Sequence, residues 1–255
     1  LRVDLGTAAR PPVPGKFSVF MPASASAPGR VGNPELAPER SLDVEIGGEY
    51  TTGATQIQAT AFVTWLLDYM IEYTIRELRD PSEPGHRYRT FGNQHALLRG
   101  FEIGVRHALL GRWLQLRATA SFAVGSPRAP IADSPSQDTD LPLVPPLRGF
   151  IELGSQPLPA LRTVLRARYS ASQDRNSDLA GEAATPMYAL LDLRAEYGPR
   201  RLWFLQGMRL YVNIHNRTDA RHREHTSQYT GVAVGFEHAH LQPGIDARAG
   251  LAVEL

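Results

Sequence analysis

The sequence has no cysteine, no long apolar run and almost no net charge. The absence of cysteine excludes disulfide bonds and thiolate metal sites. No apolar run reaches about eighteen residues, the length that a transmembrane helix needs. A formal net charge of +1 provides no overall field that would attract nucleic acid. The sequence also lacks an initiator methionine and a secretory signal peptide, and we expect it to be a fragment or a processed piece.

What the sequence does contain is an alternation of apolar and polar residues with a period of two. In Met208–His215 the even positions are apolar and the odd positions are polar or aromatic. Such a period places each set on one face of a β-sheet. No amphipathic helix of ordinary length is expected. The pattern recurs in ten segments: Leu1–Leu5, Leu42–Tyr50, Ile57–Trp65, Phe101–Arg106, Leu114–Phe122, Leu147–Leu153, Leu161–Tyr169, Ala189–Tyr197, Met208–His215 and Ala247–Leu255.

Short turns and long connections alternate strictly between these segments. The short ones lie near Thr51–Ala54, Leu109–Arg112, Ser155–Ala160 and Gly198–Gln206. The long ones are rich in proline, glycine and aspartate and lie near Ala9–Arg40, Arg76–Asn93, Gly125–Pro145, Ser170–Pro186 and Arg217–Gly244. A membrane β-barrel has this arrangement, with short turns on one side of the bilayer and long loops on the other.

Aromatic residues gather at the ends of the expected strands. Tyr50, Trp113 and Tyr197 lie beside short turns, and Phe122 and Tyr169 lie toward long connections. Such rings are typical of the two interfaces of a membrane barrel. The pattern predicts an all-β, antiparallel up-and-down transmembrane barrel. The alternative is a soluble β-sandwich with one wet face, which alternation alone does not exclude.

Several short motifs occur in a fixed order along almost the whole chain. The most specific of them is the eight-residue stretch from Gly32 to Glu39, which reads Gly-Asn-Pro-Glu-Leu-Ala-Pro-Glu and precedes an expected strand. The others are Ala9-Arg10-Pro11-Pro12, Leu98-Arg99-Gly100-Phe101-Glu102, Leu141-Pro142-Leu143-Val144-Pro145-Pro146, Asn213-Ile214-His215-Asn216-Arg217-Thr218-Asp219, Arg221-His222-Arg223-Glu224-His225 and Pro243-Gly244.

In content and order these motifs resemble the C-terminal half of the barrel of TonB-dependent outer-membrane receptors. The resemblance implies roughly ten strands of a barrel of about twenty-two, with the plug domain and the TonB box absent from residues 1–255. We therefore expect a partly open sheet; a small closed barrel of ten strands is the structural alternative. Two features depart from the family pattern: Leu255 replaces the usual terminal phenylalanine, and His215-Asn216-Arg217 replaces a more apolar stretch.

The polar rows of the expected strands carry the charges that would face the barrel interior. No nucleophile elbow or other catalytic motif is present, so we expect no enzyme. Two interpretations of the charged rows remain open: ion pairs with one another and contacts with the plug, or a polar path for a solute. The interior-facing candidates are Glu45, Glu102, Arg117, Arg166, Arg168, Asp192 and Arg194.

Histidines and arginines in the long connections are the candidate ligand-binding residues. Neutral imidazole is a common metal ligand, and His238 and His240 form an alternating pair that could share a metal ion. Solvated side chains and ordinary surface charge are the competing interpretations. Ala9–Pro34 contains no histidine, where haem receptors carry a ligand histidine, and this argues against haem uptake. The candidates for an anionic chelate are Arg10, Arg30, Arg87, Arg89, His222 and His225.

The resemblance implies an outer-membrane receptor that takes up a ferric siderophore or another metal chelate. Energy would come from the TonB complex through the plug region, and we expect no resident cofactor. The expected partners are the chelate, TonB and outer-membrane lipid, but not nucleic acid. A non-transporting barrel, such as an adhesin or surface receptor, is the alternative, and a soluble carbohydrate-binding sandwich is a third possibility. Expressed alone, a sheet with two open edges and an apolar band should aggregate or require detergent.

Overall fold

The protein forms one large antiparallel sheet built from ten long strands. These strands are β1 (Arg2–Arg10), β4 (Glu39–Thr52), β5 (Thr55–Ile75), β6 (Tyr88–Ala108), β7 (Leu114–Pro127), β8 (Arg148–Leu158), β9 (Leu161–Ser170), β10 (Tyr188–Tyr197), β12 (Leu205–His215) and β13 (Asp246–Glu254). The computed structural model describes residues 1–22, 29–75, 88–111, 113–128, 139–177, 182–198, 201–202, 205–227 and 241–254.

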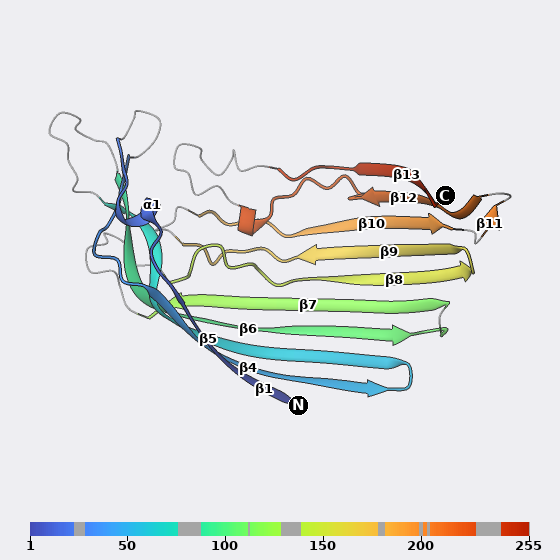
Figure 1. Cartoon of the computed structure of the whole chain (residues 1–255), viewed down its shortest axis with the longest axis horizontal. Helices are drawn as coiled ribbons and strands as arrows, with labels where there is room; N and C mark the ends of the chain where they lie inside the picture. The colour runs from blue at the N-terminus through green and yellow to red at the C-terminus, as the bar shows by residue number, and fades with distance from the viewer. Residues whose placement is uncertain are drawn as a thin grey trace.

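The long strands follow one another around a curved, open sheet (Figure 1). Each pairs with its neighbour in the chain, from β1 with β4 at one edge to β12 with β13 at the other. Within the described residues β1 and β13 have no pairing with each other, so the sheet does not close into a small barrel. The predicted all-β, up-and-down, partly open architecture is therefore confirmed.

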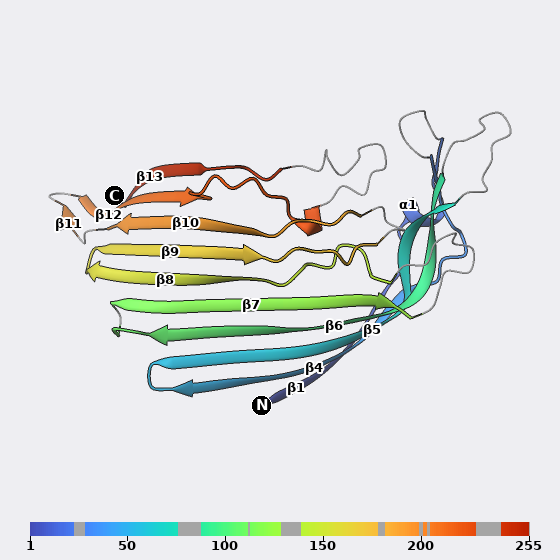
Figure 2. The same ribbon diagram turned by 180° about the vertical axis from the view of Figure 1, so that it is seen from behind.

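The two faces of the sheet differ in chemistry as the alternation predicts. Apolar side chains on the outer face are exposed, for example Ile151 (58%), Leu165 (42%) and Leu251 (59%). No second layer of described residues covers this face in either view (Figures 1 and 2). A soluble sandwich would need such a layer, because its apolar face must be buried in protein. The opposite face, the inner wall, carries the charged rows.

Short turns and long connections alternate, as predicted, and they define a turn end and a loop end of the sheet. A two-residue turn joins Thr52 of β4 to Thr55 of β5 and places Gly53 at φ +48°. Glycine adopts this left-handed conformation without the steric cost that a Cβ atom brings. The long connections all leave from the opposite end, where most of the buried residues also lie.

At the loop end β5 and β6 continue as an extension hairpin, formed by residues 66–75 and 88–97. A bulge between Leu66 and Tyr69 changes the register, with Asp68 at φ +57°. In both views the hairpin turns out of the sheet, and α1 (Pro14–Phe17) lies beside it (Figures 1 and 2). The short strands β2 (Phe20–Met21) and β3 (Gly29–Val31) pair with each other, and β3 pairs in parallel with β6.

The extension hairpin corrects the expectation of a long connection over Arg76–Asn93. Strand β6 begins at Tyr88, and β5 runs on to Ile75. Alternation fails here because protein covers both faces: the neighbours Met70 and Ile71 are 5% and 2% exposed. Met70 packs with Leu36 and Phe91. Asn33 of the Gly32–Glu39 motif donates to the Phe91 carbonyl at 2.9 Å, which docks the motif on β6.

The remaining elements are short. They are β11 (Arg201–Leu202), which pairs with β12, and a 3-10 turn, η1 (His225–Ser227). The single helix of the described chain, α1, has four residues. No described helix has the length and apolar character needed to cross a membrane.

Candidate functional site

The centre of the inner wall is a set of ion pairs between neighbouring strands. Glu152 of β8 lies opposite Arg117 of β7 and Arg166 of β9. Arg166 donates to Glu152 Oε2 from Nε at 2.8 Å and from Nη2. Arg117 Nη1 lies 3.7 Å from Glu152 Oε1. One buried carboxylate thus balances two guanidinium groups, which satisfies a charge that would be costly if left alone.

A second pair ties the inner wall to the last long connection. Arg168 binds Asp192 through both nitrogens of its fork, with Nε–Oδ2 at 2.7 Å and Nη2–Oδ1 at 3.1 Å. Asp192 also accepts the backbone N–H of Asn216 at 3.0 Å. The bidentate geometry fixes the orientation of both side chains. The point where β12 ends is therefore held against β10.

The other predicted interior residues also lie on the inner wall. Glu45 lies 3.8 Å from Arg2, and Arg194 lies 3.1 Å from Glu196. Glu102 is opposite Thr60 and Ser121 in the strand register. The structure thus brings Glu152, Arg117 and Arg166 into one cluster and Arg168 and Asp192 into another, whereas Glu45, Glu102 and Arg194 lie apart.

Above the inner wall, Glu182 organises a buried polar core that joins three long connections. Its carboxylate accepts the backbone N–H of Leu143 at 2.5 Å and of Ser177 at 3.0 Å. His225 Nε2 lies 3.9 Å from the same carboxylate, and His225 Nδ1 lies 3.3 Å from the Thr185 hydroxyl. Burial lowers the pKa of His225 from its ordinary value. The Glu182 carboxylate therefore joins the β7–β8 and β9–β10 connections, and the contact of Thr185 with His225 adds the β12–β13 connection.

Asn216 performs a similar task at the start of the last connection. It adopts φ +49° and is 2% exposed. Its amide nitrogen donates to the carbonyls of Ala220 at 3.0 Å and Pro243 at 3.3 Å, and its oxygen accepts the Ala220 N–H at 2.9 Å. Asparagine tolerates the left-handed conformation better than most residues. The sequence motif Asn213–Asp219 thus contains the residue that ties both ends of this connection together.

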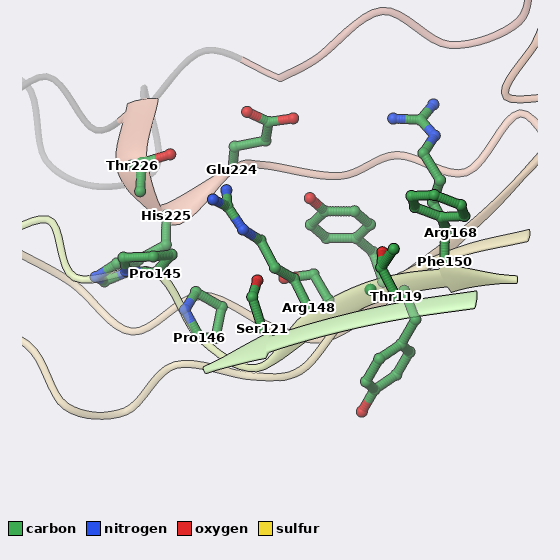
Figure 3. A pocket seen from close by; sticks show the side chains of 14 residues that line it. Thr119, Ser121, Pro145, Pro146, Arg148, Phe150, Arg168, Glu224, His225 and Thr226 are labelled. Carbon is green, nitrogen blue, oxygen red and sulfur yellow. The ribbon is translucent and has the colours of Figure 1, made fainter. Parts of the chain in front are cut away.

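Between the polar core and the inner wall lies a cleft of about 250 Å³, the loop-end cleft (Figure 3). Thr119 and Ser121 of β7, Arg148 and Phe150 of β8 and Arg168 of β9 rise from the same side of the sheet. Glu224, His225 and Thr226 close it from the last connection, and Tyr188 of β10 also lines it. The cleft is therefore polar and combines groups of both charges.

Two further hollows mark the inner wall. An apolar recess of about 370 Å³ adjoins the loop-end cleft and shares Ser121, Pro145 and Arg148 with it. A turn-end cleft of about 660 Å³ lies at the opposite end of the wall and is mainly polar. The residues that give the recess its apolar character are Phe62, Leu66, Leu98, Leu141 and Val144.

The predicted ligand-binding arginines are already engaged with acidic partners. Arg10 lies 2.8 Å from Glu39, and Arg30 and Arg89 lie 2.9 and 3.9 Å from Glu72. Arg89 belongs to the extension hairpin, and Arg10 and Arg30 lie in other segments. None of the three lines the loop-end cleft. Arg87 lies outside the described residues.

The predicted histidines separate into two groups. Both His222 and His225 are buried; His225 lines the loop-end cleft, and the His222 ring lies 4.6 Å from the ring of Tyr188, which also lines it. His238 and His240 lie outside the described residues. In the part of the chain that the structure describes, no group of three or more histidine and carboxylate side chains is placed to hold a metal ion.

Sequence reasoning passed over four residues of this site. Arg148 follows the parity of the inner row of β8, so its face could have been predicted. Asn216 lies in the Asn213–Asp219 motif, but the sequence drew attention to it only because His215-Asn216-Arg217 replaces a more apolar stretch of the family pattern. Glu182 and Glu224 lie in connections without a periodic pattern, and their roles depend on contacts between segments distant in sequence.

The family model described as TonB dependent receptor-like, beta-barrel matches residues 1–216. No curated protein matches the sequence. Solved structures share the fold at low sequence identity. The structure titled "Copper transporter OprC" has a TM-score of 0.74 at 19% identity, covering 98% of this chain and 37% of its own.

Two iron-related structures resemble the chain as well. A ferric enterobactin receptor (PfeA) mutant from Pseudomonas aeruginosa gives a TM-score of 0.65 at 16% identity, covering 98% of this chain and 37% of its own. The FrpB iron transporter from Neisseria meningitidis gives 0.62 at 15% identity, covering 85% and 31%. The chain spans about a third of the length of these proteins.

The family match covers most of the chain and agrees with the open sheet, the apolar outer face and the alternation of turns and loops. It confirms the predicted resemblance and the expectation that the chain is not an enzyme. It also places the protein in the outer membrane of Gram-negative bacteria. The chain therefore belongs to the TonB-dependent receptor family, of whose β-barrel it forms a part.

Proposed function

We propose that the protein is part of a receptor that takes up a ferric siderophore or another metal chelate across the outer membrane. The long connections and the inner wall would receive the chelate, and the TonB complex would supply energy through a plug domain. The structures that share the fold include proteins titled as copper and iron transporters and as a ferric enterobactin receptor.

The observation that carries this proposal is the polar inner wall between two clefts. The loop-end cleft lies at one end and is lined by Arg168 of the Asp192 pair, and the turn-end cleft lies at the other end and is lined by Arg117 and Glu152. These pairs neutralise charge without covering the wall with apolar groups. A hydrated chelate can pass such a surface without losing its polar contacts, whereas an apolar wall would exclude it.

Uptake of radiolabelled metal chelates by intact cells tests the proposal. Cells that carry the full gene should accumulate at least one iron or copper chelate faster than cells that lack it. Deleting the TonB gene should abolish the difference while surface binding of the chelate remains. Equal uptake of every chelate with and without the full gene would reject this function.

A non-transporting surface receptor is the second candidate, and an exposed apolar patch near α1 favours it. Phe20 is 68% exposed and Met21 is 52% exposed, on the side of the sheet that carries the long connections. Exposed apolar patches on surfaces often bind other proteins. If the protein is a surface receptor, replacing both residues by serine should weaken adhesion to host or phage proteins. If it is a chelate transporter, the same replacement should leave chelate uptake unchanged.

A further inference from the structure

The loop-end cleft contains two opposite charges that do not pair with each other. Arg148 rises from β8 toward the segment that carries Glu224 (Figure 3). Within the described part of the chain neither side chain has an ion-pair or hydrogen-bond partner. Both line the same hollow of about 250 Å³. Each therefore keeps its full capacity to bind a ligand group of opposite charge.

The neighbouring charges behave differently. Arg168 lines the same cleft but is held by Asp192 through two hydrogen bonds. Arg166 is bound to Glu152 and packs over the Phe150 ring at 4.8 Å. Their guanidinium groups are fixed and largely neutralised. A charged ligand in the cleft would thus interact most strongly with Arg148 and Glu224.

We propose that the loop-end cleft binds a zwitterionic group, with a carboxylate on Arg148 and an ammonium on Glu224. This inference rests on the proposed function, for which it names the chemical class of the chelate: one that carries a free α-amino acid. A ligand with only a carboxylate would be attracted by Arg148 but repelled by Glu224. A ligand with only an ammonium would meet the reverse situation. A ligand with both charges gains two charge-assisted hydrogen bonds and suffers neither repulsion.

The surroundings of the two charges suit such a group. Ser121 lies opposite Arg148 in the strand register, and its hydroxyl points to the same side of the sheet (Figure 3). It can therefore donate a further hydrogen bond to a carboxylate held by Arg148. The adjoining apolar recess begins at the same arginine and offers about 370 Å³ for the body of the chelate. A chelate with an apolar arm between its metal centre and its amino acid fits both hollows together.

Three probes with one metal centre separate these possibilities. The first is a ferric trihydroxamate chelate that ends in a free α-amino acid. The second is its N-acetylated form, which keeps only the carboxylate, and the third is its carboxamide, which keeps only the ammonium. Binding is measured with the full-length receptor purified in detergent. We expect the amino-acid probe to bind about tenfold more tightly than either single-charge probe, which is the effect of one charged hydrogen bond.

Two variants assign the charges to the residues. Arg148→Gln should weaken binding of the amino-acid and N-acetylated probes about tenfold and leave binding of the carboxamide probe unaffected or improved. Glu224→Gln should weaken the amino-acid and carboxamide probes and leave the N-acetylated probe unaffected or improved. Arg40→Gln on β4, whose exposed side chain lies beside Asp68, and Glu35→Gln on the exposed loop are matched controls that should not change binding. The heat-modified gel shift of each variant verifies that the barrel has formed.

The outcomes distinguish the zwitterion site from the function itself. Preference for the amino-acid probe, lost in the two cleft variants alone, supports the proposal. Equal binding of all three probes overturns the zwitterion site and leaves chelate uptake standing. A preference that survives both variants overturns the assignment to Arg148 and Glu224. If no probe binds, the zwitterion site is overturned, and the proposed function is then decided by the uptake of other chelates in cells with and without the full gene.

Discussion

The middle of the sheet and the extension hairpin are made of the same β-structure but obey different sequence rules. In β8 and β9 the outer positions are apolar and exposed, and the inner positions carry Glu152, Arg166 and Arg168. In the hairpin, consecutive residues such as Met70 and Ile71 are both buried. The difference follows from the surroundings. The middle of the sheet lies between lipid and an aqueous interior, and the hairpin lies between two layers of protein.

Apolar side chains therefore stabilise the two regions in different ways. On the hairpin, apolar residues stabilise by close packing against protein atoms, and a deletion leaves a cavity. On the outer face of the sheet, lipid chains fill any space that a smaller side chain leaves. Substitutions of the same residue type in the two regions therefore test the contrast directly.

The largest effect is expected for Ile71→Ala in the extension hairpin. Ile71 is 2% exposed and packs with Tyr73 and Tyr69. Its truncation should destabilise the hairpin by about 2–5 kcal/mol, because both the transfer energy and the cavity term are lost. Hydrogen exchange of the β5–β6 amides in the full-length receptor measures this local free energy.

Ile103→Ala on the outer face is the matched control. Ile103 is 39% exposed toward the lipid side, so its truncation leaves no closed cavity. Its effect on exchange in β5 and β6 should be clearly smaller than that of Ile71→Ala. Equal effects would mean that the outer face is packed against protein and not against lipid.

A charge on the outer face should give the next largest effect. Leu165 lies in the middle of β9 between Leu153 and Leu193 of its neighbours. Leu165→Arg should lower the free energy of unfolding by about 2–4 kcal/mol, the cost of an arginine facing lipid near the bilayer midplane. Urea unfolding in lipid vesicles measures it.

Thr60→Arg supplies the comparison on the inner wall. Thr60 lies opposite Glu102, so the new guanidinium would meet water and a carboxylate. Its cost should be under 1 kcal/mol, as for a pair exposed to solvent. If Thr60→Arg destabilises as much as Leu165→Arg, the assignment of the two faces is wrong.

The regularity of the sheet was predictable from sequence, because each strand there meets two different solvents. The parity of residues such as Leu165 and Arg166 follows from that difference alone. The positions of the turns were predictable for the same reason, since glycines such as Gly53 interrupt a clear period. The open shape followed from the resemblance to a larger barrel.

The loop end was not predictable in the same way. Residues 88–93 were expected in a connection because their two aromatic residues, Tyr88 and Phe91, fall on opposite parities among polar residues and glycine, so no period of two is visible. Glu182 gave no signal, since its two backbone partners, Leu143 and Ser177, come from different segments. The cleft also depends on Glu224, which reaches β8 only after the last connection folds back. Long-range contacts of this kind have no local pattern.

Glu182→Ala should loosen the loop end without disturbing the sheet. It would remove the acceptor of the buried Ser177 N–H, which costs about 1–3 kcal/mol when left unsatisfied, and of the partly exposed Leu143 N–H, which water can reach. The amides of Leu143 and Ser177 should exchange faster, and proteolysis of the β9–β10 connection should accelerate. The exposed Glu35→Ala should change neither. Unchanged protection at Leu143 and Ser177 would show that Glu182 does not hold the β7–β8 and β9–β10 connections together.

The smallest effect is a pH dependence that belongs to the loop end alone. Burial lowers the pKa of His225, whose ordinary value is 6.5, so the opened loop binds a proton more readily than the closed one. The contribution of His225 to closure is therefore complete above that value and declines as the pH falls below it. Glu182 at 3.9 Å and the Thr185 hydroxyl face the imidazole. Glu182 is already engaged with two N–H groups, so its charge does not reverse this sign.

The protection factors of the amides in the three connections, corrected for the intrinsic pH dependence of exchange, should fall as the pH is lowered from about 7.5 to 5.5. His225→Gln should remove this fall. The strands β8 and β9 should not respond, because neither contains a histidine. A response of equal size in both regions would contradict a local origin at His225.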